Sequence, residues 1–74
     1  MPPELHDNAT EALAFLTEES EAITNYLPLV LSLLVSDNAT AQTVLAHMET
    51  RQADISATRL VIQNLLKELD KYVN

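Results

Sequence analysis

The chain of 74 residues contains no cysteine and no glycine. The lack of cysteine excludes disulfides and thiolate metal ligands, which often stabilise domains of this size. The lack of glycine argues against a strand-rich fold, because tight turns between strands usually need residues with a positive φ. We therefore expect one all-α domain over residues 1–74, with very few turns.

Basic residues are missing from the first half of the chain. Residues 1–37 carry seven acids and no Lys or Arg, whereas residues 38–74 carry four acids and four bases, so the net charge is −7. Direct binding to nucleic acid or to anionic lipid is disfavoured, because both need clustered cations. A basic partner would be the electrostatic complement of the first half.

Long hydrophobic runs are also missing. The longest nearly unbroken apolar run, from Tyr26 to Val35, has 10 residues. A membrane-spanning helix needs about 20. The N-terminal residues show neither the basic nor the apolar region of a signal peptide. We expect no membrane span and an intracellular, cytoplasmic location.

The tetrapeptide Asp-Asn-Ala-Thr is present twice, at residues 7–10 and 37–40. Each copy has the Asn-x-Thr pattern of a glycosylation site, but a chain without a signal peptide would not meet the glycosylation machinery. Sliding the chain over itself by 30 residues brings only one further identity, Glu19 with Glu49, which argues against an internal duplication. Asp, Asn and Thr are typical helix N-caps, because their side chains accept hydrogen bonds from free backbone N–H groups. We predict that both copies begin helices.

Apolar residues recur at alternating steps of four and three in both halves, which is the spacing of a coiled-coil seam. Eight of nine such positions are apolar in the first half: Leu5, Ala9, Ala12, Leu16, Glu19, Ile23, Tyr26, Val30 and Leu33. Eight of ten are apolar in the second: Ala41, Leu45, Met48, Gln52, Ile55, Arg59, Ile62, Leu66, Leu69 and Val73. The spacing predicts an antiparallel helical hairpin that forms a coiled-coil or four-helix-bundle assembly.

The predicted hairpin has a helix over about residues 8–35, a turn at 35–38 and a helix over about 38–73. Pro28 interrupts the first helix, because its nitrogen cannot donate to the Thr24 carbonyl and its ring crowds that carbonyl. Since the seam keeps its phase across Pro28, we expect a kink near residues 24–28. The alternative is a break into two helices, over about 8–25 and 28–35.

Two segments, residues 26–35 and 60–69, are apolar on more faces than a hairpin can bury. A helix in a two-helix hairpin buries only one stripe, so leucines off the seam are left for a partner. The candidate partner-binding residues are Leu27, Leu31, Leu34, Leu60 and Leu65. Because a chain this short has a small core, we expect it not to be a stable monomer and to bind protein partners, either copies of itself or other chains.

Three polar residues, Glu19, Gln52 and Arg59, lie at seam positions. They either line a solvated groove, with long side chains that reach outward, or include a pair that fixes the register of the helices. For the second hypothesis the candidate pair is Glu19 with Arg59, or with Arg51. A hairpin places Glu19 opposite about residue 55, one turn from either arginine.

The sequence shows little sign of catalytic chemistry. His6 and His47 are far apart and lack paired metal-ligand spacing. A chain without glycine has no phosphate-binding loop. The acids Glu18, Glu19 and Glu21 are typical of a solvated helix face, whereas catalytic carboxylates need a partly dry pocket. We expect no metal, no cofactor and no enzymatic activity.

Two classes of function remain. The first is a non-enzymatic protein–protein interaction subunit or adaptor, which packs apolar helix faces into a homo- or hetero-oligomeric bundle. The second is an acidic inhibitor, antitoxin-like protein or chaperone that covers a basic or aggregation-prone surface of its partner. The sustained seam and the surplus of apolar residues favour the first class, and the charge asymmetry favours the second.

Overall fold

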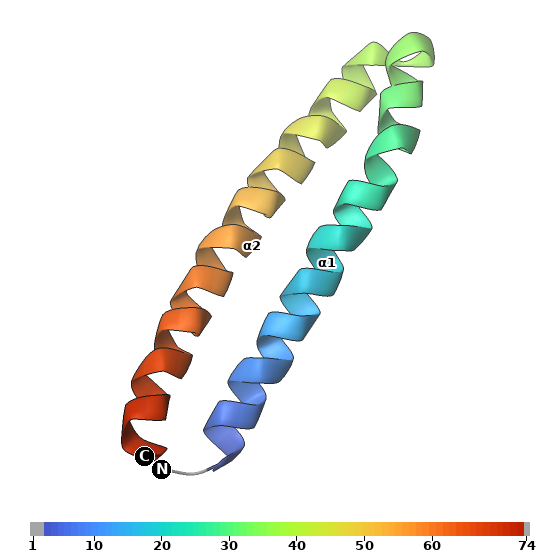
Figure 1. The fold of residues 1–74 in the computed structure, drawn as a ribbon. Helices are drawn as coiled ribbons and strands as arrows, with labels where there is room; N and C mark the ends of the chain where they lie inside the picture. Colours follow the sequence, from blue (N-terminus) through green and yellow to red (C-terminus); the bar gives the residue numbers. More distant parts are fainter. Residues whose placement is uncertain (1–2, 74) are drawn as a thin grey trace.

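The computed structural model describes residues 3–73 as two long helices. Helix α1 spans Pro3–Ser36 and helix α2 spans Asn38–Val73. The helices lie side by side and antiparallel, with Asp37 at the turn end and both Pro3 and Val73 at the opposite, open end (Figure 1). The hairpin is an extended rod of 57 × 15 × 12 Å. The predicted antiparallel all-α hairpin is confirmed.

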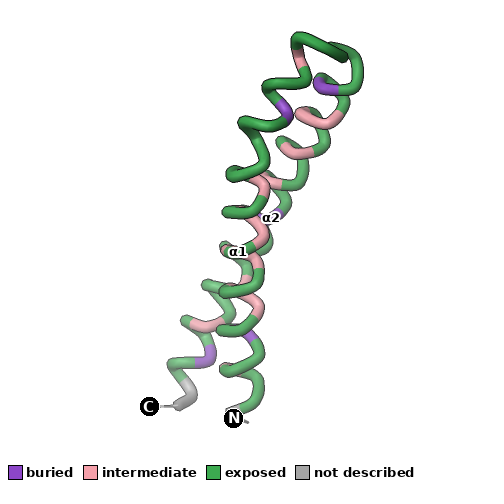
Figure 2. The backbone as a smooth tube through the Cα atoms, turned by 90° about the vertical axis from the view of Figure 1, so that its right-hand side faces the viewer, coloured by how far each residue is buried: buried purple, intermediate pink, exposed green. Residues whose placement is uncertain are grey.

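The core is a narrow line between the two helices. Buried and half-buried residues follow this line, and exposed residues cover the outside (Figure 2). The fully buried apolar residues are Ala9, Val30, Ala41, Ile55 and Leu69. All five lie at predicted seam positions, so each helix buries one stripe against the other.

The seam of α2 follows the prediction closely. The described seam side chains from Ala41 to Leu69 are all buried or half-buried. Ile55, in the middle of this stripe, is only 2% exposed. Val73 lies outside the residues whose side chains the structure describes. The four-three spacing therefore identified the buried stripe of α2 along its described length.

The seam of α1 differs from the prediction at its first residue, Leu5, which is exposed, and near the turn. Tyr26 and Leu33 are exposed, whereas Leu34 is half-buried and Leu27 lies at the edge of the interface. Two pairs of residues could pack beside the buried residue Val30, namely Tyr26 with Leu33 or Leu27 with Leu34. In each pair one residue precedes Val30 and the other follows it, at a distance of three or four residues. Because all four of these residues are apolar, the spacing alone could not show which pair faces α2.

The first Asp-Asn-Ala-Thr tetrapeptide does not begin a helix, and that prediction was wrong. Helix α1 is already formed at Pro3, so residues 7–10 lie inside it. Proline is favoured at the first helical position because its fixed φ suits the helix and its missing N–H would have no partner there. The Thr10 hydroxyl donates to the His6 carbonyl at 2.9 Å, a contact within the helix rather than a cap.

The second tetrapeptide caps α2, as predicted. The Thr40 backbone N–H donates to Asp37 Oδ1 at 3.1 Å, and the Thr40 hydroxyl donates to Asp37 Oδ2 at 2.7 Å. The Asp37 N–H donates to the Leu33 carbonyl at 2.7 Å, so the same residue also closes the last turn of α1. No residue that the structure describes takes a positive φ. One residue therefore connects the helices without the conformation that favours glycine.

Helix α1 runs through Pro28 without a break. The proline leaves the Thr24 carbonyl without its usual backbone donor. Beyond it, Val30 is 2% exposed and Leu34 is half-buried against α2, so packing holds the last two turns in helical form. The alternative of two separate helices is therefore wrong.

Neither α1 nor α2, over the residues described, includes a stretch long and apolar enough to cross a membrane.

The buried stripe predicts the effect of shortening Ile55. We expect Ile55→Ala to lower the free energy of unfolding by about 2–4 kcal/mol, because Ile55 is a large buried side chain in a narrow core. Urea unfolding followed by circular dichroism, at one protein concentration, measures the change. Exposed Ser56 is the control, and Ser56→Ala should change stability by less than about 0.5 kcal/mol. Equal losses in both variants would contradict the assigned core.

Candidate interaction surface

The hairpin has two long faces, one on either side of the contact between its helices. Ile23 and Met48 line grooves on both sides, so these two side chains mark the centre of the contact. One groove also includes Tyr26 and Val44, and the opposite groove includes Leu27. We call the side of Tyr26 and Val44 the apolar face, and the opposite side the polar face.

The apolar face continues towards the open end. A further groove of about 660 Å³ lies there, lined by Phe15, Leu16, Thr58 and Ile62 among others. These residues lie one or two heptads away from residues that line the first groove of this face, the one that includes Tyr26 and Val44. This spacing keeps them on the same side of each helix. For example, Phe15 lies seven residues before Ala22, which lines the first groove. The two grooves therefore belong to one surface along the hairpin.

Most of the large exposed apolar side chains belong to the apolar face. Each of these side chains lines one of the two grooves, or lies one turn or a whole number of heptads from a residue that does. They are between 39 and 66% exposed. The set comprises Leu5, Phe15, Tyr26, Leu29, Leu33, Val61 and Leu65. Both helices contribute, and the members occur on both sides of the hairpin's midpoint. Monomeric proteins rarely expose an apolar surface this extensive.

An ion pair lies in the middle of the apolar face. Arg51 Nη2 donates to Glu19 Oε1 at 2.9 Å, and Arg51 Nε donates to Glu19 Oε2. This two-pronged contact holds the pKa of Glu19 below its ordinary value of 4.5 and raises the pKa of Arg51. The Arg51 side chain is half exposed, so solvent screens the pair. Its contribution to stability is therefore small.

The structure thus pairs Glu19 with Arg51 and not with Arg59, which corrects the candidate register pair. Arg51 lies on the apolar face beside Glu19, whereas Arg59 lies two turns further along α2. The Nε atom of Arg59 is buried and has no hydrogen-bond partner among the described residues. An unsatisfied buried donor reduces stability.

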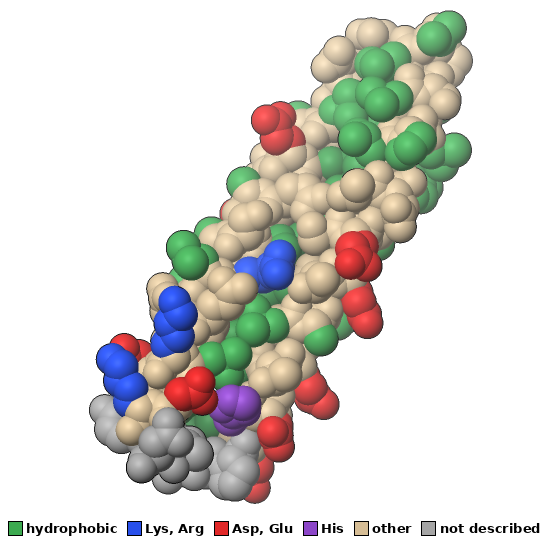
Figure 3. All heavy atoms as spheres, in the orientation of Figure 1, with side chains coloured by type: hydrophobic (Ala, Val, Ile, Leu, Met, Phe, Trp, Pro, Cys, Tyr) green, Lys and Arg blue, Asp and Glu red, His purple; other side chains and the backbone are tan. Residues whose placement is uncertain are grey.

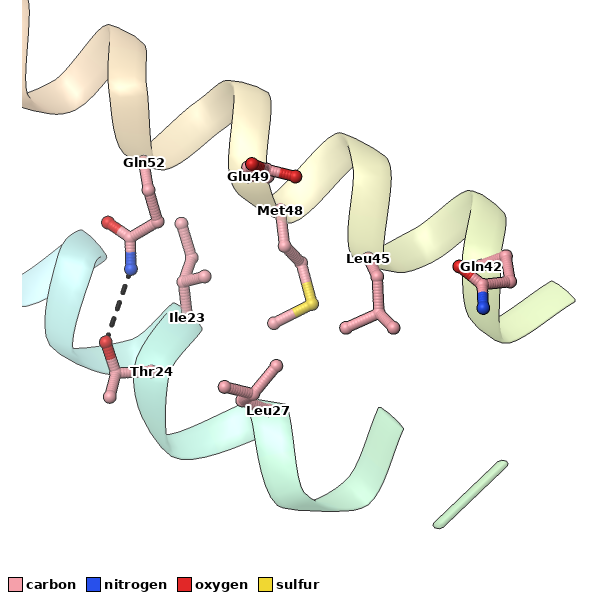
Figure 4. A pocket seen from close by; sticks show the side chains of 8 residues that line it. All are labelled: Ile23, Thr24, Leu27, Gln42, Leu45, Met48, Glu49 and Gln52. Carbon is pink, nitrogen blue, oxygen red and sulfur yellow. Dashed lines mark hydrogen bonds between the residues drawn. The ribbon is translucent and has the colours of Figure 1, made fainter. Parts of the chain in front are cut away.

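The polar face has a hydrogen-bond network at the same level. The Ser20 hydroxyl donates to Gln52 Oε1 at 2.8 Å, and Gln52 Nε2 donates to the Ser20 carbonyl at 3.1 Å. Gln52 Nε2 also lies 3.3 Å from the Thr24 hydroxyl (Figure 4). Gln52 therefore connects the helices instead of extending into solvent. Its position in the seam was the only sequence signal for this network.

The groove on the polar face lies beside this network and towards the turn. It has a volume of about 520 Å³. Leu27, Leu45 and Met48 point towards one another in it, while Gln42, Glu49 and Gln52 supply its polar rim (Figure 4). The groove is shallow and open, so it does not enclose a small molecule as ligand pockets do.

Charge is distributed unevenly along the rod. Residues 22–48, which form the turn half, contain one formally charged side chain, Asp37. The remaining acids and all four bases lie in residues 4–21 and 49–71. On the face in Figure 3, green and tan side chains dominate near the turn, and red and blue side chains gather towards the open end. The turn half therefore offers contacts that are almost free of charge.

The five candidate partner-binding leucines do not form one surface. Leu65 lies on the apolar face, while Leu27 lines the groove on the polar face and Leu31 lies one heptad after Thr24 on that side. Leu34 is half-buried at the seam, and Leu60 is 59% exposed on the outer side of α2. Sequence reasoning missed Phe15, Tyr26, Leu29, Leu33 and Val61. For four of them the available signal was heptad spacing, which relates Phe15 to Leu29 and Tyr26 to Leu33.

The two histidines lie apart. His6 Nε2 is 3.5 Å from Asp70 Oδ1, which forms an ion pair across the open end when His6 is protonated. His47 is exposed on α2. Among residues 3–73, no group of three or more His, Cys, Asp or Glu side chains is arranged to hold a metal ion.

Comparison of the chain with protein-family models, with curated proteins and with solved structures finds no match.

The Glu19–Arg51 pair predicts a pH-dependent difference in stability. Because the folded-state pKa of Glu19 lies below 4.5, the pair stabilises the hairpin above that pH. The contribution is lost as the pH falls through the lower folded-state pKa. We expect wild type to exceed Glu19→Gln in stability at neutral pH, and the gap to close in acid. Urea unfolding over a pH series measures this gap.

Glu18 provides the matched control, because it is exposed and makes no ion pair within residues 3–73. Glu18→Gln should show no gap that closes in acid. A gap of the same size and pH dependence in both variants would assign the effect to net charge instead of to the pair.

The buried Nε of Arg59 predicts a stabilising substitution. Arg59→Met keeps the length of the apolar stem and removes the unsatisfied donor, so it should raise the free energy of unfolding by roughly 1 kcal/mol. Thermal unfolding at fixed concentration measures the change. The control is Arg51→Met, which breaks the pair with Glu19 and should lower stability. A loss in Arg59→Met would show that the arginine makes a net favourable contact.

Proposed function

We propose that the protein is a non-enzymatic interaction subunit, which packs its apolar face against further helices. The observation that carries the proposal is the concentration of exposed large apolar side chains on one face of the hairpin, which both helices build. Removing such surface from water is favourable by about 25 cal/mol per Å². Exposed apolar surface of this extent is typical of a protein-binding site.

The architecture supports the same function. Two helices form a single layer, and helical domains usually bury their apolar stripes in bundles of three or more helices. The turn half adds to this argument, because Leu29 and Val35 are exposed there and Val35 is 95% exposed. Few charges would have to be removed from water when a partner covers this half. Docked helices would complete the missing second layer.

A second candidate function follows from the acids of α1. Glu4, Asp7, Glu11, Glu18 and Glu21 are all exposed, and α1 contains no Lys or Arg. An acidic inhibitor or chaperone would set this helix against a basic surface. The two functions differ in salt dependence, because screening weakens charge pairing and has little effect on apolar contacts.

The proposal predicts that leucines of the apolar face are needed for association. We expect Leu29→Ser with Leu65→Ser to weaken binding to the partner at least about a hundredfold, because each buried leucine contributes roughly 1.5–3 kcal/mol. Affinity capture from the source cells, followed by titration of the recovered partner, measures the loss. Circular dichroism verifies that the variant keeps its helices.

Leu31→Ser with Leu60→Ser is the matched control. Leu31 and Leu60 are 46 and 59% exposed, against 44 and 57% for Leu65 and Leu29, but they lie off the apolar face. This control should retain binding. Loss of binding in the control and retention in the apolar-face variant would contradict the proposal. Binding that weakens steeply with added salt and survives both leucine pairs would favour the acidic inhibitor.

A further inference from the structure

We propose that the apolar face is covered by the apolar face of a second copy of the chain. The product is a four-helix bundle with one two-fold axis along the length of the hairpins. In this bundle α1 of each copy packs against α2 of the other, and both turns lie at the same end. The inference rests on the proposed function and specifies the partner.

The area of the apolar face matches what a stable dimer needs. Its seven exposed apolar side chains offer on the order of 700 Å² per copy, and a standard protein interface buries about 800 Å² per partner. Both helices contribute to the face, from Leu5 near the open end to Leu33 near the turn. A partner that covers it fully must carry an apolar strip of similar length, and a second copy carries one.

Charge selects the way in which the two copies face each other. Helix α1 has six acids and no base, whereas α2 has four acids and four bases. A two-fold arrangement with α1 against α1 makes these helices antiparallel, and it leaves the six acids of each copy beside a helix that has no base. Packing α1 against α2 places them beside the helix that holds all four bases. The second arrangement offers the acids of each copy basic partners.

The central ion pair points to the same arrangement. Glu19 and Arg51 are at the same level on the apolar face, joined by the 2.9 Å bond. With the two-fold axis along the hairpins, Glu19 of one copy faces Arg51 of the other, so four charges alternate in sign around a ring. With α1 against α1, Glu19 would face Glu19. Polar contacts of this kind fix orientation in helical bundles.

The first test is sedimentation equilibrium of the purified full chain over a range of concentrations. We expect a dimer for wild type and for the Leu31→Ser, Leu60→Ser control. The Leu29→Ser, Leu65→Ser variant should have a dimer dissociation constant at least about a hundredfold higher. A wild-type monomer at every concentration would overturn the inference. The capture experiment would then still decide whether a different partner uses the face, so the two proposals can fail separately.

The second test measures the arrangement, and it uses the absence of cysteine from the chain. Ala22 is exposed and lines a groove of the apolar face, and exposed His47 lies one turn after Val44, which lines the same groove. Single-cysteine chains Ala22→Cys and His47→Cys are mixed and treated with a short bismaleimide. We expect cross-linking between the two different chains and little cross-linking of Ala22→Cys with itself. Dimers that cross-link through Ala22→Cys alone, or through neither pair, would overturn the proposed orientation.

Discussion

The structure depends on one constraint, which is that each of two helices can bury only the stripe that faces the other. Five apolar residues are fully buried along that stripe, and two of them are alanines that let the helices approach closely. The chain is nevertheless 47% hydrophobic. Most of that apolar content must therefore remain on the surface or be covered by another molecule. The exposed face is a direct consequence of stopping at two helices.

Much of the fold could be predicted from periodicity and composition. The absence of glycine and the four-three spacing indicated two helices and one turn, and the seam of α2 agrees with the structure. The start of α1 could not be predicted in this way, because residues 7–10 and 37–40 are identical in sequence but differ in what precedes them. Asp37 follows a complete helix and caps the next, whereas Asp7 follows Pro3 and Glu4, which favour a helix that has already begun.

The interaction surface was harder to predict than the hairpin. Near the turn, α1 is apolar in every row that could face α2, so the sequence could not show that Leu34 turns inward while Leu29 and Leu33 stay exposed. A similar ambiguity affected the arginines. The sequence places Glu19 opposite about residue 55, with an arginine one turn away in either direction, whereas the register of the folded hairpin brings Arg51 beside it. The residues of the apolar face and those of the polar face can be told apart only once the two helices are packed together.

The single-residue turn at Asp37 has a consequence for the order in which the molecule folds. The cap joins residues three apart, the polar contacts at the midpoint join residues 32 apart, and His6 and Asp70 meet at the far end. The entropy lost in closing a loop grows with its length, so contacts beside the turn form most readily. Folding would proceed as a zipper from Asp37 outward. Fraying would proceed in reverse, and native-state hydrogen exchange would detect it as protection that falls steadily from the turn to the open end.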